Sequence, residues 1–144
     1  MKGKCSQGAR PQLFWKTVWS LRIPNSAKMF LRQACNRILP TKDNLKKRRV
    51  LTNDICIFCC RAVETTHHIL WDYPSSQDVW CVNGSRIQKR RFEGDDFSEL
   101  VENLIEFLHK DEIKLFAMIA KRIWKRRNGV VYGETFIHPC TVVR

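Results

Sequence analysis

The sequence has few of the residues that mark loops and linkers. Of its 144 residues only six are glycine and five are proline, and no segment is repeated or of low complexity. This is not the composition of a repeat protein or a flexible linker, and the 44% hydrophobic content is enough to fill a core. We therefore expect a folded chain, with one modest domain or two small ones.

The sequence also lacks any long apolar run. A membrane-spanning helix needs about 20 apolar residues, so no membrane partner is expected. Residues 1–12, MKGKCSQGARPQ, are basic but have no apolar stretch of the kind found in secretory signals. We expect an intracellular protein, nuclear or cytoplasmic, that is not secreted. Its seven cysteines then favour metal or redox chemistry over a disulfide framework.

Acidic residues are scarce and unevenly placed. The chain has 26 Lys and Arg against 14 Asp and Glu, a net charge of +12, and residues 1–50 contain one acid, Asp43. Residues 93–115 are acidic, and residues 116–144 are basic again. Basic segments attract phosphate by counterion release, so RNA or DNA, bound with low sequence specificity, is the expected partner. The alternative is a solvated basic surface without a partner. The candidate nucleic-acid contacts are Lys42, Lys46, Lys47, Arg48, Arg49, Arg86, Lys89, Arg90 and Arg91.

The spacing of apolar residues predicts a mainly α-helical chain. The expected helices cover residues 12–22, 27–39, 42–49, 76–83, 97–108 and 111–128. Thr41 is the expected cap of the third, and Asn128-Gly129 is expected to end the last. The apolar faces of the last two helices are expected to meet in an antiparallel hairpin.

A change of composition suggests how the chain is divided. Residues 85–96 are polar and switch from basic to acidic, as in a linker. The predicted organisation is a basic tail (1–12), a small helical domain with a central zinc knuckle (13–84), the linker (85–96), and a helical hairpin with its tail (97–144).

The segment 56–74, CIFCCRAVETTHHILWDYP, has the residue types of a metal knuckle. Zinc prefers four soft or borderline ligands in a tetrahedron, and Cys-x2-Cys followed by a histidine supplies three. These candidates are Cys56, Cys59 and His68. The fourth position, five residues after the histidine, is Tyr73, whose phenol has an ordinary pKa of about 10 and must lose a proton to bind metal.

Two interpretations of this segment are open. Zinc is bound by the three candidates, with Cys60, His67, Cys81 or water as the fourth ligand. Alternatively the site has decayed, and its cysteines are small buried apolar residues. A catalytic zinc with Glu64 or Asp72 as base is disfavoured, because no His-x-Glu precedes the Cys-x2-Cys and no His-Glu-x-x-His or P-loop is present. We expect no enzymatic activity and no small-molecule substrate.

These motifs together resemble the zinc-binding domain of plant non-LTR (LINE-type) retrotransposon reverse transcriptases. The resemblance covers roughly residues 13–82. The matching residues are Trp15, Trp19, Pro24, Lys28, Phe30, Leu39, Pro40, Thr41, Leu45, Cys56, Cys59, Glu64, Thr65, His68, Pro74, Val79 and Trp80. Residues 121–134, KRIWKRRNGVVYGE, also resemble the Ile-Trp-x-x-Arg-Asn helix that follows this domain.

The resemblance implies a zinc-stabilised accessory module that helps to hold template RNA or DNA. It implies zinc ligands at Cys56, Cys59 and His68, and the sequence departs from the family at Tyr73, where the family has its final cysteine. The parent polymerase and RNase H domains are not expected in this chain, which we interpret as a retroelement fragment. The alternatives are a helical protein-interaction module built on residues 97–108, or a functionless translated relic.

Five aromatic side chains could either stack on bases or fill the core. Most lie on predicted apolar faces, which favours the core. The expected exception is the tryptophan beside Asp72. The five residues are Trp15, Trp19, Phe30, Trp71 and Trp80.

Overall fold

The computed structural model describes residues 12–83, 94 and 96–131, and this part of the chain is mainly helical, as predicted. It contains no β-strand beyond an isolated antiparallel bridge between Ile55 and Val63. No helix in it is long and apolar enough to cross a membrane. The helices are α2 (Gln12–Ser20), α3 (Asn25–Cys35), α4 (Lys42–Lys47), the π-helix η1 (His68–Asp72), α5 (Pro74–Asn83), α7 (Phe97–Phe107) and α8 (Lys110–Val131).

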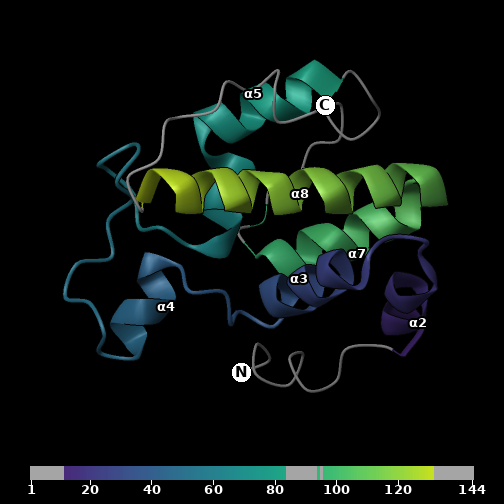
Figure 1. Ribbon diagram of the computed structural model, residues 1–144, viewed down its shortest axis with the longest axis horizontal. Coiled ribbons are helices and arrows are strands. Elements are labelled where there is room, and N and C mark those ends of the chain that lie inside the picture. Colours follow the sequence, from purple (N-terminus) through teal and green to yellow (C-terminus); the bar gives the residue numbers. More distant parts are fainter. Residues whose placement is uncertain (1–11, 84–93, 95, 132–144) are drawn as a thin grey trace.

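The long helix α8 runs through the middle of the molecule (Figure 1). It packs against α3 and α7 on one side and against η1 on another, while α5 packs against η1. The short helix α4 and helix α2 lie at opposite ends of the view. Because α8 is covered on two sides, nine of its residues are buried.

Helix α3 ends earlier than predicted, and the reason is a left-handed residue. Its apolar stripe is buried as expected, but the helix stops at Cys35, and Arg37 adopts φ 61°. The Ile38 N–H then donates to the Gln33 carbonyl (3.0 Å), a bond that closes a Schellman turn. Because the chain turns here, Ile38 leaves the apolar face that a helix over residues 27–39 would give it and is 45% exposed.

The cap of α4 is the one predicted. The Thr41 hydroxyl oxygen accepts from the Asn44 N–H at 3.2 Å, which satisfies a donor that the first turn leaves unpaired. The helix ends in a second Schellman turn, in which Arg49 has φ 62° and the Val50 N–H donates to the Leu45 carbonyl. The basic run therefore lies on a short helix and the turn that follows it.

A cluster of aromatic rings joins α5, η1, α7 and α8. Phe116 stacks on Trp80 with ring centroids 5.1 Å apart and on Phe97 at 6.0 Å. Trp71 lies 5.5 Å from Trp80, whose indole N–H donates to the Leu70 carbonyl at 3.0 Å. The elements on both sides of residues 84–95 thus contribute to one hydrophobic core. The predicted linker lies mostly outside the described residues, and the division of the chain there stays a prediction.

The C-terminal helices pack differently from a simple hairpin. The apolar stripe of α7 is buried as predicted, but against α2 and α3 as well as α8. Burial of this stripe counts against its use as a docking surface for another protein. Helix α8 also continues through Asn128-Gly129 to Val131, so the predicted stop was wrong.

The tryptophan expected to be accessible is buried. Trp71 is only 7% exposed because it packs in the aromatic cluster. The exposed tryptophan is instead Trp19, at 42%, on the outer side of α2. Phe30 and Trp80 are core residues, as expected.

Candidate zinc site

The Cys-x2-Cys segment forms a tight turn. The bridge between Ile55 and Val63 closes its base, and the Cys60 N–H donates to the Cys56 carbonyl at 2.8 Å. Cys60 has φ 59°, which turns the chain back, and the Ala62 N–H points at the Cys59 sulfur (3.4 Å). The turn thereby presents both cysteine sulfurs on one side.

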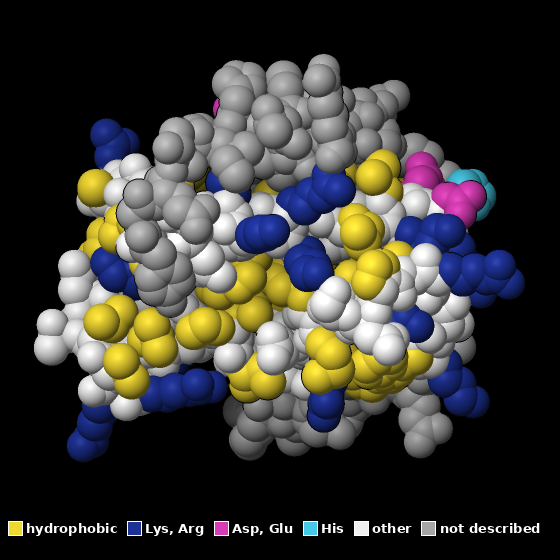
Figure 2. Space-filling model, viewed as in Figure 1, with side chains coloured by type: hydrophobic (Ala, Val, Ile, Leu, Met, Phe, Trp, Pro, Cys, Tyr) yellow, Lys and Arg dark blue, Asp and Glu magenta, His cyan; other side chains and the backbone are white. Residues whose placement is uncertain are grey.

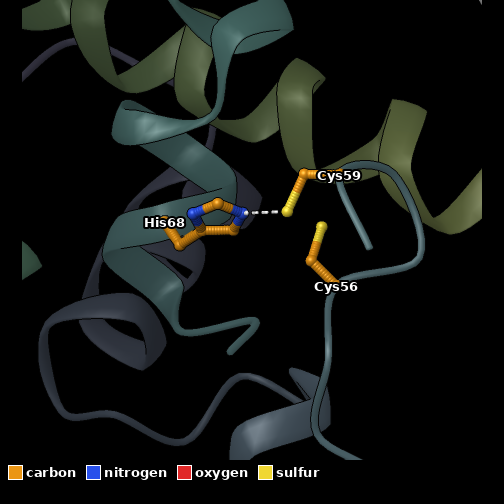
Figure 3. Close-up of side chains that lie close together, drawn as sticks. All are labelled: Cys56, Cys59 and His68. Carbon is orange, nitrogen blue, oxygen red and sulfur yellow. Dashed lines mark hydrogen bonds between the residues drawn. The ribbon is translucent and has the colours of Figure 1, made fainter. Parts of the chain in front are cut away.

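The histidine comes from the helical turn that follows. The His68 N–H donates to the Thr65 hydroxyl at 3.0 Å, which fixes the start of this turn. Its Nε2 lies 3.5 Å from the Cys59 sulfur. The three ligand atoms of Cys56, Cys59 and His68 lie within 4.8 Å of one another, and Figure 3 shows the three side chains converging from the turn and from η1.

These separations fit a zinc ion. With Zn–S bonds of about 2.3 Å and Zn–N bonds of about 2.05 Å, tetrahedral angles place sulfur and nitrogen about 3.6 Å apart. The observed distance between the Cys59 sulfur and His68 Nε2 is 3.5 Å. Two thiols and an imidazole are also the donor types that zinc prefers.

The π-helix explains how position 73 faces the cluster. Its hallmark bond runs from the Tyr73 N–H to the His68 carbonyl (2.7 Å), five residues back. In an α-helix, residues five apart point about 140° away from each other, whereas a wider π-turn brings them to the same side. The Tyr73 ring accordingly lies 5.9 Å from the His68 ring and 5.4 Å from Phe58. The backbone therefore brings position 73 to the same side as His68 and the candidate ligands.

The local environment shifts the pKa values of the four groups in different directions. The Ala62 N–H bond lowers the pKa of the Cys59 thiol, which favours the thiolate that binds metal. Burial lowers the pKa of His68, which favours the neutral imidazole, and burial raises the pKa of Cys56. Burial, with the nearby thiols, also raises the pKa of Tyr73, so its phenol holds its proton more firmly than usual.

The other candidate fourth ligands lie outside the cluster. Among the described residues the cluster has three members, and Cys60, His67 and Cys81 are not among them. Cys60 is exposed and its thiol points at the Ile57 carbonyl, His67 is buried, and Cys81 is exposed on α5. Asp72, one of the two acids considered as a base, is exposed.

Glu64, the other acid, has a different role. It is fully buried, and Arg127 of α8 binds both of its carboxylate oxygens, at 2.9 Å and 2.6 Å. The Lys42 N–H at the start of α4 donates to the same carboxylate at 2.7 Å. Arg127 also lies over the Trp124 ring, 4.7 Å from its centroid. Glu64 thus ties the knuckle segment to α4 and to α8.

Sequence reasoning missed this ion pair, although its signal was present. Glu64 belongs to the Glu-Thr pair of the resemblance, and Arg127 is the arginine of Ile-Trp-x-x-Arg-Asn. The two residues are 63 positions apart, so periodicity could not pair them. Only the packing of α8 beside η1 brings them together.

The predicted nucleic-acid contacts are only partly described. Arg86, Lys89, Arg90 and Arg91 lie outside the described residues. Lys46 pairs with Asp54 at 3.5 Å and Lys47 with Asp43 at 3.2 Å, so two of the four charges in residues 46–49 have acidic neighbours. Lys42 is half-buried, and Arg48 and Arg49 are exposed.

Comparisons with known proteins agree with the geometry. Residues 4–80 match the family described as zinc-binding in reverse transcriptase. A protein of Arabidopsis thaliana named "Putative ribonuclease H protein At1g65750" is 30% identical over 131 residues, which are 87% of this chain and 21% of that protein. The chain therefore spans about a fifth of that relative's length. No solved structure matches the chain.

Proposed function

This chain belongs to the family of zinc-binding domains of reverse transcriptases and derives from a retroelement, and on that premise we propose that it is a non-catalytic accessory module that binds zinc and contacts RNA or DNA. The observation that carries the proposal is the convergence of three ligand atoms within 4.8 Å. The metal would be held by Cys56, Cys59 and His68. Bound there, zinc would supply a cross-link between the cysteine turn and η1.

The proposed role of the metal is structural for two reasons. Glu64 is engaged by Arg127 and the α4 backbone, so it is not available as a base. Asp72 is exposed and outside the cluster. The three ligands leave one coordination position, which a protein ligand at position 73 would close in the family pattern.

Metal content of the purified chain tests the zinc proposal. We expect zinc to be retained by the wild type, more tightly by Tyr73→Cys, and to be lost in Cys59→Ser. Cobalt substitution gives a second measurement, because thiolate-bound Co²⁺ absorbs in the visible range and the spectrum reports the number of sulfur ligands. Equal and negligible metal in the wild type and in Tyr73→Cys would refute the site.

The nucleic-acid part of the proposal rests on charge. The net charge of the chain is +12, and Arg48 and Arg49, at the end of the basic segment 42–49, are exposed. Binding should weaken steeply with salt, because neutralised phosphates release counterions. A salt titration with a labelled oligonucleotide checks this, and no detectable binding at low salt would refute it.

A further inference from the structure

We propose that a polar cavity between α3, α4 and α7 holds one unpaired base of the bound nucleic-acid strand. The cavity has a volume of about 230 Å³ and is lined by the end of α3 and the turn after it, by α4, by residues 65–67 and by the start of α7. The inference rests on the proposed contact with RNA or DNA and names the place where a base is held. It adds a second kind of contact to the phosphate contacts expected from the basic residues.

The size of the cavity fits a nucleobase. Pockets for drug-sized molecules usually have volumes of about 300–1,000 Å³, so this cavity is too small for most of them. It is larger than a cavity of about 150 Å³, which is enough to hold a benzene ring inside a protein. Ala34 and Phe97 contribute apolar surface to its lining. A planar ligand of one or two rings, such as a pyrimidine or a purine, therefore suits the cavity.

Two buried side chains of the cavity retain hydrogen-bonding capacity that the other described residues do not use. Asn44 is 9% exposed and Thr66 is 8% exposed, and both line the cavity. The Asn44 amide nitrogen donates to the Leu39 carbonyl at 2.7 Å. Within the described part of the chain, however, the Asn44 amide oxygen and the Thr66 hydroxyl have no hydrogen-bond partner. Buried polar groups rarely stay without one, and an amide oxygen and a hydroxyl can pair with the edge of an unpaired base.

The charged side chains of the lining balance one another. Arg37 pairs with Asp96 at 2.8 Å, and Lys47 pairs with Asp43 at 3.2 Å. Burying a further charge among these pairs would be costly, because it would have no counter-charge of its own. The interior of the cavity therefore favours an uncharged polar ligand over a free phosphate. A nucleobase is uncharged and carries both donors and acceptors.

The two cations of the lining can hold the phosphates on either side of the base. The Arg37 and Lys47 side chains are 47% and 69% exposed, so they extend from the cavity to solvent. A guanidinium has five N–H donors, and the bond to Asp96 engages one nitrogen of Arg37, which leaves donors for a phosphate oxygen. Cations also dominate the face of the molecule in Figure 2, where most of the acidic side chains in view gather at one end. The charge outside the cavity thus attracts phosphates, while the cavity suits the base.

Strands with and without bases test the proposal. The full chain and its variants Thr66→Val and Thr66→Ser are titrated with a labelled single-stranded oligodeoxynucleotide and with an abasic strand of the same length and charge. Thr66→Val removes the hydroxyl at nearly constant shape, whereas Thr66→Ser retains it. We expect Thr66→Val to weaken binding of the base-bearing strand about 3- to 10-fold, the loss of one hydrogen bond, and to leave binding of the abasic strand unchanged. Thr66→Ser should bind both strands as the wild type does.

Lys47→Gln is the matched control for charge. It removes one cation beside the cavity, so it should lower the slope of log K against log salt by about 0.7 for both strands alike. Thermal unfolding checks that each variant folds. If Thr66→Val does not fold, the wild type is crosslinked by near-ultraviolet light to a strand that contains 4-thiothymidine. Crosslinks to residues 34–47 or 65–67, located by mass spectrometry, support the proposal, and crosslinks confined to other segments overturn it.

The outcomes separate this inference from the proposed function. If the wild type binds the two strands equally tightly, no base is held in the cavity, and nucleic-acid binding itself stands. The same conclusion follows if Thr66→Val weakens both strands by the same factor or weakens neither. If the wild type binds neither strand at low salt, the proposed nucleic-acid function and this inference are both overturned.

Discussion

The knuckle segment, residues 56–74, contains two sites that can hold it to the rest of the molecule, the candidate zinc site and the buried ion pair of Glu64 with Arg127. At the candidate zinc site the ligand atoms of Cys56, Cys59 and His68 converge within 4.8 Å, and Tyr73 lies beside them without being one of the three. At the ion pair, Arg127 binds both oxygens of Glu64, and the Lys42 N–H adds a third bond. Both ends of the ion pair are buried, with 5% and 0% of their side chains exposed.

The comparison shows which of the two sites, the candidate zinc site or the Glu64–Arg127 ion pair, can lose one of its residues with less cost in stability. A buried carboxylate that loses its arginine stays in a low-dielectric surrounding with a charge that nothing balances. The thiols and imidazole of the candidate zinc site can stay neutral without a metal, and the surrounding core still holds them in place. We therefore expect the stability of this chain to depend more on the ion pair than on the metal.

The largest expected effect comes from breaking the ion pair. Arg127→Met should lower the free energy of unfolding by about 3–5 kcal/mol, because it leaves the Glu64 charge buried and unbalanced. Urea unfolding measures it. The double variant Glu64→Leu/Arg127→Met is the control and should recover much of the loss. If Arg127→Met is as stable as the wild type, the stability of the chain does not depend on the ion pair.

Placing a cysteine at position 73 should strengthen zinc binding at the candidate site. With free zinc 100-fold above its dissociation constant, Tyr73→Cys should gain about 2.7 kcal/mol over its metal-free form. The wild type should gain less at the same zinc concentration. Thermal unfolding with zinc and with a chelator measures both.

Tyr73→Phe is the matched control for that experiment. It keeps the ring and removes the hydroxyl, so it should respond to zinc as the wild type does. If the phenylalanine variant loses a zinc response that the wild type has, the phenol is itself a ligand.

A partly exposed ion pair should matter less than the buried one. Asp96 caps α7 by accepting from the Ser98 N–H and pairs with Arg37 at 2.8 Å. Asp96→Ala should cost about 1 kcal/mol, the typical loss for an N-cap. Comparison of the urea midpoints of the two proteins at neutral pH checks this value.

The same residue predicts a pH dependence. Burial alone would raise the pKa of Asp96, but Arg37 and Ser98 outweigh it, and the pKa lies below its ordinary value. The stabilisation is therefore complete above the pKa of the unfolded state and is lost as the pH falls through the lowered folded value. The stability difference between the wild type and Asp96→Ala should shrink on acidification. If this stability difference instead grows as the pH falls, the pKa of Asp96 is not lowered by folding.

The smallest effect is expected at the exposed pair on α4. Lys47 and Asp43 are four residues apart and 3.2 Å from each other, and the lysine is 69% exposed. Lys47→Gln should change the free energy of unfolding by less than about 0.5 kcal/mol. A loss comparable to that of Asp96→Ala would show that this pair contributes more than exposed ion pairs usually do.

Much of the local structure could be predicted because it depends on neighbouring residues. The Thr41 cap, the buried stripes of α3 and α7, and the three clustered ligands all follow from short-range spacing. The errors have physical causes that spacing does not contain. A left-handed residue at Arg37 turned Ile38 outward, and α8 continued past Asn128-Gly129, where the Asn128 side chain accepts a bond from the buried Arg127.

The sequence by itself determined the family, the helical class and the three candidate ligands, because residue types at short fixed spacings express these features. Only the tertiary structure decided that Arg127 neutralises Glu64 and that Trp71 is core while Trp19 is exposed. Each of these depends on how α8 packs among elements far from it in the chain. Such packing is set by the summed burial of many side chains, which no local pattern reveals.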